Sequence, residues 1–305
     1  MSVFNAYMAL SGAVDADIVR DEPLDKHTSY RIGGPCDLFV RAHTLSALVK
    51  TVETLDSCGV GWVILGKGSN VLASDEGYRG CVITLGREFS RVSVQAGGVI
   101  VAGAGAALSK LVNDAFKASY AGLECCVGVP GTVGGALWMN AGTRREWIGS
   151  AVHDVVSYAP GTGLVRRVAA EIDWGYRTTS LPAGEILLEA TFQLTPDSRE
   201  AIASRTDALL HRRTRTQPTG VLSCGSVFKN PPSGRGAAEL IEGLGLKGES
   251  CGGARISEKH ANFIVSDGHA SARDVISLMR TAHDAVLANA GVDLTPEVRF
   301  LGFEG

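Results

Sequence analysis

Two glycine-rich segments are the parts of the sequence best suited to bind phosphate. The first reads Leu65-Gly66-Lys67-Gly68-Ser69-Asn70 and follows a short apolar, strand-like run. The second, Gly128 to Gly135, reads Gly-Val-Pro-Gly-Thr-Val-Gly-Gly and leads towards Asn140-Ala141-Gly142. Glycines after a strand let backbone N–H groups approach a phosphate closely, because no Cβ atom intervenes. The pair predicts a ligand with two phosphates, such as a dinucleotide; tight turns without a ligand are the alternative.

Two well-known phosphate-binding patterns do not account for these segments. Gly61 to Lys67 has the spacing of a P-loop, but Gly68 stands where Ser or Thr is required, and the four intervening residues read as a strand. Gly103-Ala104-Gly105 begins a dinucleotide fingerprint, but Leu108 replaces its last glycine. The sequence therefore predicts neither a P-loop nor a Rossmann fold.

The elements that must position these segments change in character along the chain. Up to about residue 195, short β-like runs alternate with glycine turns, and a helix is predicted at Ala107 to Ala118. The predicted strands are Val63 to Leu65, Cys81 to Leu85, Val99 to Ala102, Val152 to Ala159 and Ile186 to Phe192.

A second, α+β part is predicted beyond a boundary near 195–200. Thr195-Pro196-Asp197 has the pattern of a helix start, with Thr as N-cap, and the helix is predicted to reach about Arg213. Ser271 and Asp274 have the spacing of a capping box. The other predicted elements are helices at Ala237 to Gly243 and Ser271 to Ala290 and strands at Phe263 to Val265 and Pro296 to Leu301.

Composition excludes several functional classes. There are 29 Lys+Arg against 32 Asp+Glu, so the formal charge of -3 favours neither nucleic acid nor a membrane surface as partner. The dense basic run Arg212, Arg213 and Arg215 is either a cation-rich helix C-terminus or an anion-binding site. The N-terminus has no secretory pattern and no apolar run is long enough to span a bilayer, which predicts a cytoplasmic protein.

The cysteines predict neither a disulfide framework nor a metal site. The seven cysteines are an odd number, include no C-x-x-C pair, and are spread through the chain. We expect each to be a small buried hydrophobe, including Cys224, which lies close to a candidate catalytic serine.

Seven sequence blocks, in order, resemble the UDP-N-acetylenolpyruvoylglucosamine reductase family. Any one block would be a weak signal, but the resemblance runs from about residue 25 to 302. The blocks are His27 to Gly34, Gly66 to Asn70, Gly128 to Gly135, Trp174 to Arg177, Cys224 to Pro231, Lys259 to Val265 and Pro296 to Arg299.

The resemblance implies an α+β protein with a PCMH (vanillyl-alcohol-oxidase) type FAD-binding domain of two subdomains. We expect this domain at 1–197, a smaller α+β substrate-binding domain at 198–292, and a C-terminal strand, 293–305, returning to the flavin. The implied contacts of non-covalent FAD are Gly66, Lys67, Gly68, Ser69, Asn70, Pro130, Gly131, Thr132, Gly134, Gly135, Ala141 and Gly142. The chain looks like the family variant without an extra substrate loop.

The resemblance also implies a reaction in two halves, in peptidoglycan precursor synthesis. NADPH, the co-substrate, gives a hydride to the flavin; UDP-N-acetylglucosamine enolpyruvate then accepts that hydride and a proton, giving UDP-N-acetylmuramate. Arg177 would oppose the charge that builds on the substrate carboxylate, Glu297 would donate a hydrogen bond there, and Ser226 would donate the proton. Without the resemblance these three would be a loop Arg, a strand-end Glu and a turn Ser.

Further residues are implied in substrate binding, and the protein is expected to be a monomer without a metal. A lysine often precedes Gln-Pro in the family, but here Thr216 does, so Arg215 is the candidate cation for the diphosphate. His260 is alternatively a core or hinge histidine. The complete implied set is Tyr176, Arg215, Lys229, Asn230 and His260.

Two other functions are weighed against the reductase. An oxidase of the same fold would often tether FAD through His or Cys, and no such motif is evident near Gly66 to Asn70. A flavin- or UDP-sugar-binding protein without turnover would not need the three candidate catalytic residues, all of which are present.

Overall fold

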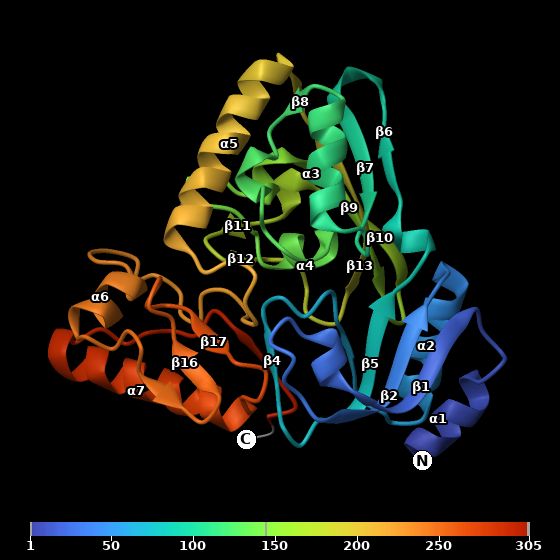
Figure 1. The fold of residues 1–305 in the computed structure, drawn as a ribbon. Coiled ribbons are helices and arrows are strands. Elements are labelled where there is room, and N and C mark those ends of the chain that lie inside the picture. Colours follow the sequence, from blue (N-terminus) through green and yellow to red (C-terminus); the bar gives the residue numbers. More distant parts are fainter. Residues whose placement is uncertain (1, 144, 304–305) are drawn as a thin grey trace. The chain divides into compact units, whose positions relative to one another are not determined.

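The chain divides into two compact units in the computed structural model, which describes residues 2–143 and 145–303 (Figure 1). The first unit contains the chain up to Arg20 together with Asp37–Gly66 and Gly80–Arg212. The second is assembled from Asp21–Cys36, Lys67–Arg79 and the chain from Arg213 onwards. Each unit is therefore built from segments that are far apart in sequence.

A four-stranded sheet forms one part of the first unit, with strand order β1-β2-β5-β3. β3 runs parallel to β5, with Trp62 opposite Cys81. Thr44 caps α2 by accepting a hydrogen bond from the Ala47 N–H (3.2 Å). The elements are α1 (Val3–Leu10), α2 (Leu45–Ser57), β1 (Ala16–Pro23), β2 (Pro35–Ala42), β3 (Trp62–Ile64) and β5 (Tyr78–Leu85).

A five-stranded antiparallel sheet forms the other part of this unit, in the order β10-β9-β13-β7-β6. Helices α3 and α4 cover one face of it (Figure 1). The predicted strands and the helix at 107–118 are confirmed. The elements are β6 (Val92–Val94), β7 (Val99–Gly103), β9 (Val152–Ala159), β10 (Gly163–Val168), β13 (Ile186–Gln193), α3 (Leu108–Lys117) and α4 (Val133–Trp138).

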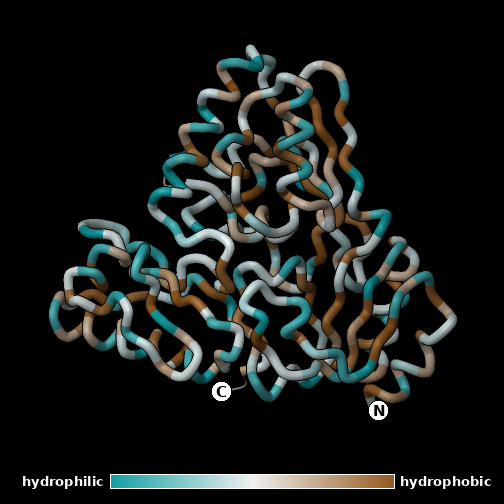
Figure 2. Tube along the Cα trace, viewed as in Figure 1, coloured by the Kyte–Doolittle hydropathy of each residue, from teal (hydrophilic) through white to brown (hydrophobic). Residues whose placement is uncertain are grey.

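Strand β13 serves both apolar clusters of the first unit. Ile186 and Leu188 belong to the cluster with α1 and α2, whereas Leu187 belongs to the cluster under α3. Successive side chains of a strand point to opposite faces, so one strand closes two cores. Figure 2 shows apolar residues along much of the strands of this unit, interrupted by polar ones.

The start predicted for α5 (Arg199–Thr216) is wrong by several residues. Thr195 and Pro196 instead form the short strand β14, which pairs with β8 (Tyr120–Ala121). Ser198 is the residue that caps the helix, since its hydroxyl accepts from the Ala201 N–H (3.2 Å). Pairing partners 74 and 76 residues away thus override a local helix-start pattern.

The second unit combines a three-stranded sheet, β15-β16-β17, with the helices α6 and α7. The two predicted helices and the strand at β17 are confirmed, whereas β15 and β16 were not predicted. Tyr30 lies at 0% exposure in its core, and its hydroxyl donates to the Ile264 carbonyl (2.9 Å). The elements are β4 (Val71–Ala73), α6 (Ala237–Gly243), β15 (Ser250–Cys251), β16 (Ala254–Ile256), β17 (Ile264–Ser266), α7 (Ala272–Ala290) and β18 (Arg299–Leu301), which runs parallel to β4.

Short connecting elements complete the description. A two-stranded ribbon, β11 (Trp174–Gly175) with β12 (Thr178–Thr179), carries the Tyr176–Arg177 turn. In the described part of the chain, no helix has the length and apolar character needed to span a bilayer. The 3-10 helices are Leu24–His27, Glu88–Ser90, Ala96–Gly98, Glu124–Cys126, Ile148–Ala151 and Ala169–Glu171.

We predict that Ser271→Ala destabilises the second unit. The predicted capping box is confirmed: Ser271 Oγ accepts from the Asp274 N–H (3.1 Å), and the Asp274 carboxylate accepts from the Ser271 N–H (2.9 Å). Loss of such a cap costs about 1 kcal/mol. Urea denaturation would measure this loss, and Ser277→Ala, on the exposed side of α7, is the control that should leave the midpoint unchanged.

We also predict a small pH-dependent contribution from His283. Hydrogen bonds to Asp284 and Asp293, both 2.9 Å, raise the pKa of this histidine. A raised folded-state pKa means that the contribution is complete below about pH 6.5 and is lost as pH rises through the higher folded value. Because the carboxylates are exposed, the difference in unfolding free energy between wild type and His283→Gln should stay below about 1 kcal/mol. A difference that grows with pH would contradict this assignment.

Candidate active site

The two glycine-rich segments meet inside the first unit. A Cβ atom on Gly66 would lie 2.7 Å from Thr132 Oγ1, so glycine is required for this approach. Thr132 caps α4 by accepting from the Gly135 N–H (3.2 Å). A Cβ on Gly134 would similarly lie 2.9 Å from the Ala104 Cβ at the end of β7. The predicted juxtaposition of the two loops is therefore present.

These loops fit a ligand with a diphosphate group. Glycines without a side chain lie at these close approaches, and Gly131 has a φ of +126°, where a side chain would be strained. Backbone N–H groups in such turns bind phosphate oxygens. The first unit thus offers a cradle to which FAD could bind through Gly66, Pro130, Gly131, Thr132, Gly134, Gly135, Ala141 and Gly142.

Asn140 fixes the position of the Ala141–Gly142 turn. Its side chain is 1% exposed; Nδ2 donates to the Gly175 carbonyl (2.8 Å), and Oδ1 accepts from the Gly149 N–H (3.1 Å). This amide joins the turn to the ribbon that carries Tyr176 and Arg177. Sequence reasoning noticed Asn140 as part of a motif but assigned it no role.

Arg177 lies beside the same turn. Its Nη2 donates to the Gly142 carbonyl (3.1 Å), and its guanidinium lies 5.2 Å from the centre of the Tyr176 ring. Arg177 has a φ of +55°, an uncommon value for a residue other than glycine. Such an outlier at a residue predicted to be catalytic is consistent with a functional constraint. The structure therefore places this predicted arginine next to Gly142, a predicted FAD-contacting residue.

The chain passes from the first unit to the second between Gly66 and Lys67. In the second unit, a Cβ on Gly68 would lie 2.2 Å from the His27 carbonyl oxygen, and its φ is +60°. The Ser29 N–H donates to the Gly68 carbonyl (3.2 Å), and the Ser29 hydroxyl donates to the Ser223 carbonyl (2.7 Å). Ser29 belongs to the sequence block His27 to Gly34, which gives no indication of this bridge.

Ser226 and Glu297 lie on adjoining backbone segments of the second unit. The Glu297 N–H donates to the carbonyl of Val227, the residue after Ser226 (2.8 Å). The Asn70 side chain donates to the Glu297 carbonyl (3.1 Å), and the Arg299 N–H donates to the Asn70 carbonyl (2.9 Å). Three predicted site residues, from the beginning and the end of the chain, are thereby held together.

The predicted substrate residues of this unit have different surroundings. Lys229 follows the Ser226 segment, and its N–H donates to the Thr295 carbonyl (2.8 Å). Asn230 accepts from the Ala237 N–H at the start of α6 (3.0 Å), which gives it a structural contact in addition to its predicted role. Arg215 is exposed in the last turn of α5, a helix that Figure 2 shows as mostly hydrophilic.

His260 is partly buried and packs edge-on against Phe263, with ring centres 4.8 Å apart. Burial lowers its pKa, so the ring is neutral near pH 7. A neutral ring acts in hydrogen bonding rather than as a fixed positive charge.

Cys224 is buried, as predicted, and belongs to the core of the second unit. Burial raises the pKa of its thiol to about 12, so it does not provide a thiolate at neutral pH. All seven cysteine side chains are thiols; six are buried and Cys251 is partly exposed. Among the described residues, no group of His, Cys, Asp or Glu side chains is arranged to hold a metal ion.

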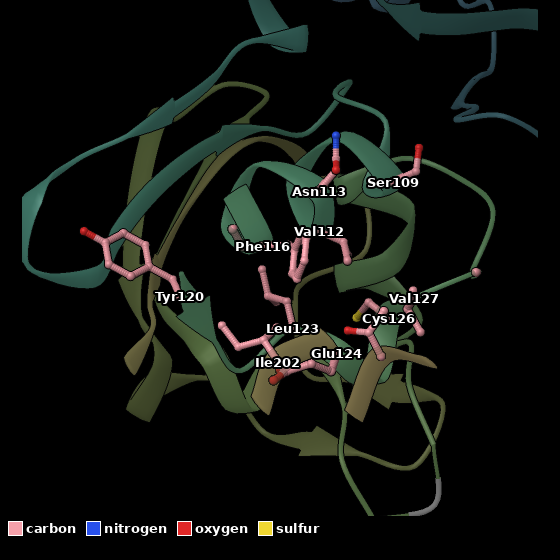
Figure 3. A pocket seen from close by; sticks show the side chains of 13 residues that line it. Ser109, Val112, Asn113, Phe116, Tyr120, Leu123, Glu124, Cys126, Val127 and Ile202 are labelled. Carbon is pink, nitrogen blue, oxygen red and sulfur yellow. The ribbon is translucent and has the colours of Figure 1, made fainter. Parts of the chain in front are cut away.

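A cavity of about 180 Å³ lies apart from the predicted site residues, none of which lines it (Figure 3). Its wall is largely apolar and comes from α3, the segment 123–128 and the start of α5. The side chains that it exposes include Val112, Phe116, Leu123 and Ile202. Glu124 also lines the cavity, and its carboxylate forms an ion pair with Arg205 (2.8 Å).

Comparison with known proteins identifies the family of this chain. Residues 36–159 match the model of an FAD binding domain, and residues 217–301 match the C-terminal domain of UDP-N-acetylenolpyruvoylglucosamine reductase. A protein of that name from Geobacter sulfurreducens is 40% identical over 295 residues, covering 97% of each chain. The chain belongs to the UDP-N-acetylenolpyruvoylglucosamine reductase family.

Two further comparisons agree with this membership. A reductase of the same name from Pelobacter propionicus is 41% identical, over 94% of this chain and 96% of its own. The crystal structure of the UDP-N-acetylenolpyruvylglucosamine reductase from Thermus caldophilus has a TM-score of 0.81 and 34% identity, over 94% of this chain and 98% of that chain. The predicted fold class, a PCMH-type FAD-binding domain with a smaller α+β domain, and FAD as cofactor are confirmed.

We predict that Gly66→Ala weakens flavin binding through a clash with Thr132. The added methyl would lie 2.7 Å from Thr132 Oγ1 and must push the two loops apart. Removing Thr132 Oγ1 would relieve the clash, so Gly66→Ala combined with Thr132→Ala should lose less affinity than the two single changes predict together. Flavin absorbance retained after dialysis measures this. Gly243→Ala, whose methyl would have only an ordinary contact at 3.7 Å, is the control; additive losses would contradict the assigned contact.

Proposed function

We propose that this protein reduces UDP-N-acetylglucosamine enolpyruvate to UDP-N-acetylmuramate with NADPH, through bound FAD, in peptidoglycan precursor synthesis. One observation carries the proposal: proteins named for this reductase activity match along almost the whole chain, 97% of it in the first comparison. The three residues expected to act on the substrate, Arg177, Ser226 and Glu297, are all present in their motifs.

Bound FAD supplies hydride transfer, so the protein has to orient the substrate, stabilise charge and deliver a proton. Overall, the hydride and its electron pair come from NADPH and add to the terminal vinyl carbon, and a proton adds to the neighbouring carbon. We assign that proton to the Ser226 hydroxyl, which then regains a proton from solvent. Its backbone pairs with Phe263, and the next residue, Val227, accepts from the Glu297 N–H; this fixed position supports a donor role.

Arg177 and Glu297 are assigned to the substrate carboxylate. Negative charge grows on that group as hydride adds to the double bond, and a guanidinium is suited to oppose it because its N–H groups match carboxylate geometry. Arg177 lies beside Gly142, a candidate FAD contact, which supports this role. Glu297 would act as a hydrogen-bond donor in its protonated form.

The remaining assignments follow the same family pattern. We propose that Tyr176, Arg215, Lys229, Asn230 and His260 bind the substrate, and that Lys67, Gly68, Ser69 and Asn70 complete FAD binding. We further propose that residues 1–197 are the flavin domain, 198–292 the substrate domain and 293–305 the returning strand. The protein is proposed to act as a cytoplasmic monomer without nucleic acid or membrane partners.

The first test is NADPH oxidation by the purified, flavin-containing protein with and without the enolpyruvyl substrate. We expect substrate-dependent oxidation that falls about 10²–10⁴-fold in Ser226→Ala, the range for loss of a general acid. Reduction of bound FAD by NADPH alone should remain, since that half of the reaction does not use the serine proton.

Ser223→Ala is the matched control in the same segment, because Ser223 accepts from the Ser29 hydroxyl through its backbone carbonyl, which the variant retains. It should retain near-normal turnover. A yellow protein whose NADPH oxidation ignores the substrate would contradict the proposal and favour an oxidase of the same fold.

A further inference from the structure

Asn262 is a buried amide whose hydrogen-bonding groups all point to the candidate site of the second unit. Its side chain is 2% exposed. Oδ1 accepts from the Phe228 N–H (3.0 Å), and Nδ2 donates to the Phe228 carbonyl (2.8 Å). The Asn262 backbone carbonyl accepts from the Val227 N–H (2.9 Å). One residue thus binds the backbone of the two residues that follow Ser226.

The same segment is also held by the chain near residue 296. The Glu297 N–H donates to the Val227 carbonyl (2.8 Å), Phe228 bridges to Pro296, and the Lys229 N–H donates to the Thr295 carbonyl (2.8 Å). Asn262 therefore fixes one edge of the Val227–Phe228 segment and the Glu297 strand fixes the other. Ser226 itself pairs with Phe263, the residue after Asn262.

Asn262 also holds the ring of His260. The Asn262 N–H donates to His260 Nδ1 (3.3 Å), which requires that Nδ1 be unprotonated. Since burial keeps the ring neutral, its single proton is then on Nε2. His260 can therefore offer an N–H donor, rather than an acceptor, to an oxygen of a bound molecule.

We infer that Asn262 is a positioning residue that sets the Ser226 hydroxyl and the His260 Nε2–H for the second half of the reaction. This inference rests on the proposed function, in which Ser226 donates the proton and His260 contacts substrate. A carboxamide is suited to the task because it is neutral and pairs one donor and one acceptor with a peptide N–H and C=O. Misplacement of a reacting group by about 1 Å can cost about 10²-fold in rate.

Asn262→Asp gives the sharpest test, because aspartate has nearly the same shape as asparagine but its carboxylate lacks the N–H donor to the Phe228 carbonyl. At about pH 8 the ionised carboxylate would face the Phe228 carbonyl without a proton to donate, and we expect FAD reoxidation by the enolpyruvyl substrate to slow about 10- to 100-fold. Reduction of FAD by NADPH should change less than about twofold, because it does not use the serine proton. Stopped-flow absorbance separates these two steps.

Acid should restore the Asn262→Asp variant. A buried carboxyl has a raised pKa, and once protonated it regains a donor for the Phe228 carbonyl. The ratio of variant to wild-type reoxidation rates should therefore rise as pH falls from about 8 to about 5.5. Asn262→Leu, which cannot regain the donor, should show no such rise. Asn262→Ser, with a smaller polar side chain, keeps the test available if the aspartate variant does not fold.

Val286→Ala is the matched stability control, since Val286 is 0% exposed in the same core and lies on α7 rather than on a segment that holds Ser226. It should lower stability and leave reoxidation unchanged. The inference is overturned if the Asn262 variants slow both half-reactions equally, reoxidise at the wild-type rate, or show no acid recovery in Asn262→Asp. Failure of the proposed function looks different: wild-type FAD would be reduced by NADPH and not reoxidised by the substrate.

Discussion

The hydrogen bond from the Ser29 hydroxyl to the Ser223 carbonyl joins residues 194 positions apart and is central to the second unit. The residues of this unit are not continuous in sequence, because it is assembled from three separate segments of the chain. Ser29 also contacts Gly68, so all three segments meet at one residue. Hydrogen bonds between distant parts of the chain also place Ser226. The Asn70 side chain donates to the Glu297 carbonyl, and the Glu297 N–H donates to the carbonyl of Val227, the residue after Ser226. Closing loops of this length costs conformational entropy, which buried apolar contacts in the same core must offset.

Close backbone approach is the second constraint, and it explains why glycine recurs at the loops. Gly66 faces Thr132, and Gly68 faces the His27 carbonyl, at separations that leave no room for a Cβ atom. At Gly66 the constraint is packing, whereas at Gly68 a positive φ adds a conformational one. The loops proposed to bind the FAD diphosphate are thus restricted in sequence by their own packing.

Local patterns predicted the regular elements well and failed where a distant partner decided the outcome. The capping box at Ser271 is a local feature, because its hydrogen bonds lie within four residues, and it was predicted correctly. Thr195-Pro196 has an equally local helix-start pattern, but pairing with Tyr120–Ala121 converts it into strand β14. The approach of Gly66 to Thr132 was expected only in outline, from two glycine-rich loops suited to one ligand. The individual contact could not be deduced, since nothing in the sequence fixes the distance between the loops.

The residues that sequence reasoning missed share one property: they act through the backbone of other residues. Asn140 binds the carbonyl of Gly175 and the N–H of Gly149, and Asn262 binds both backbone groups of Phe228. Such an amide contributes little net stability, because its hydrogen bonds replace those made to water. Its effect is on specificity: an incorrectly placed segment would leave buried donors and acceptors unpaired, which is costly. Each unit therefore contains one buried asparagine that selects a single position for a segment next to a candidate catalytic residue, Arg177 in the first unit and Ser226 in the second.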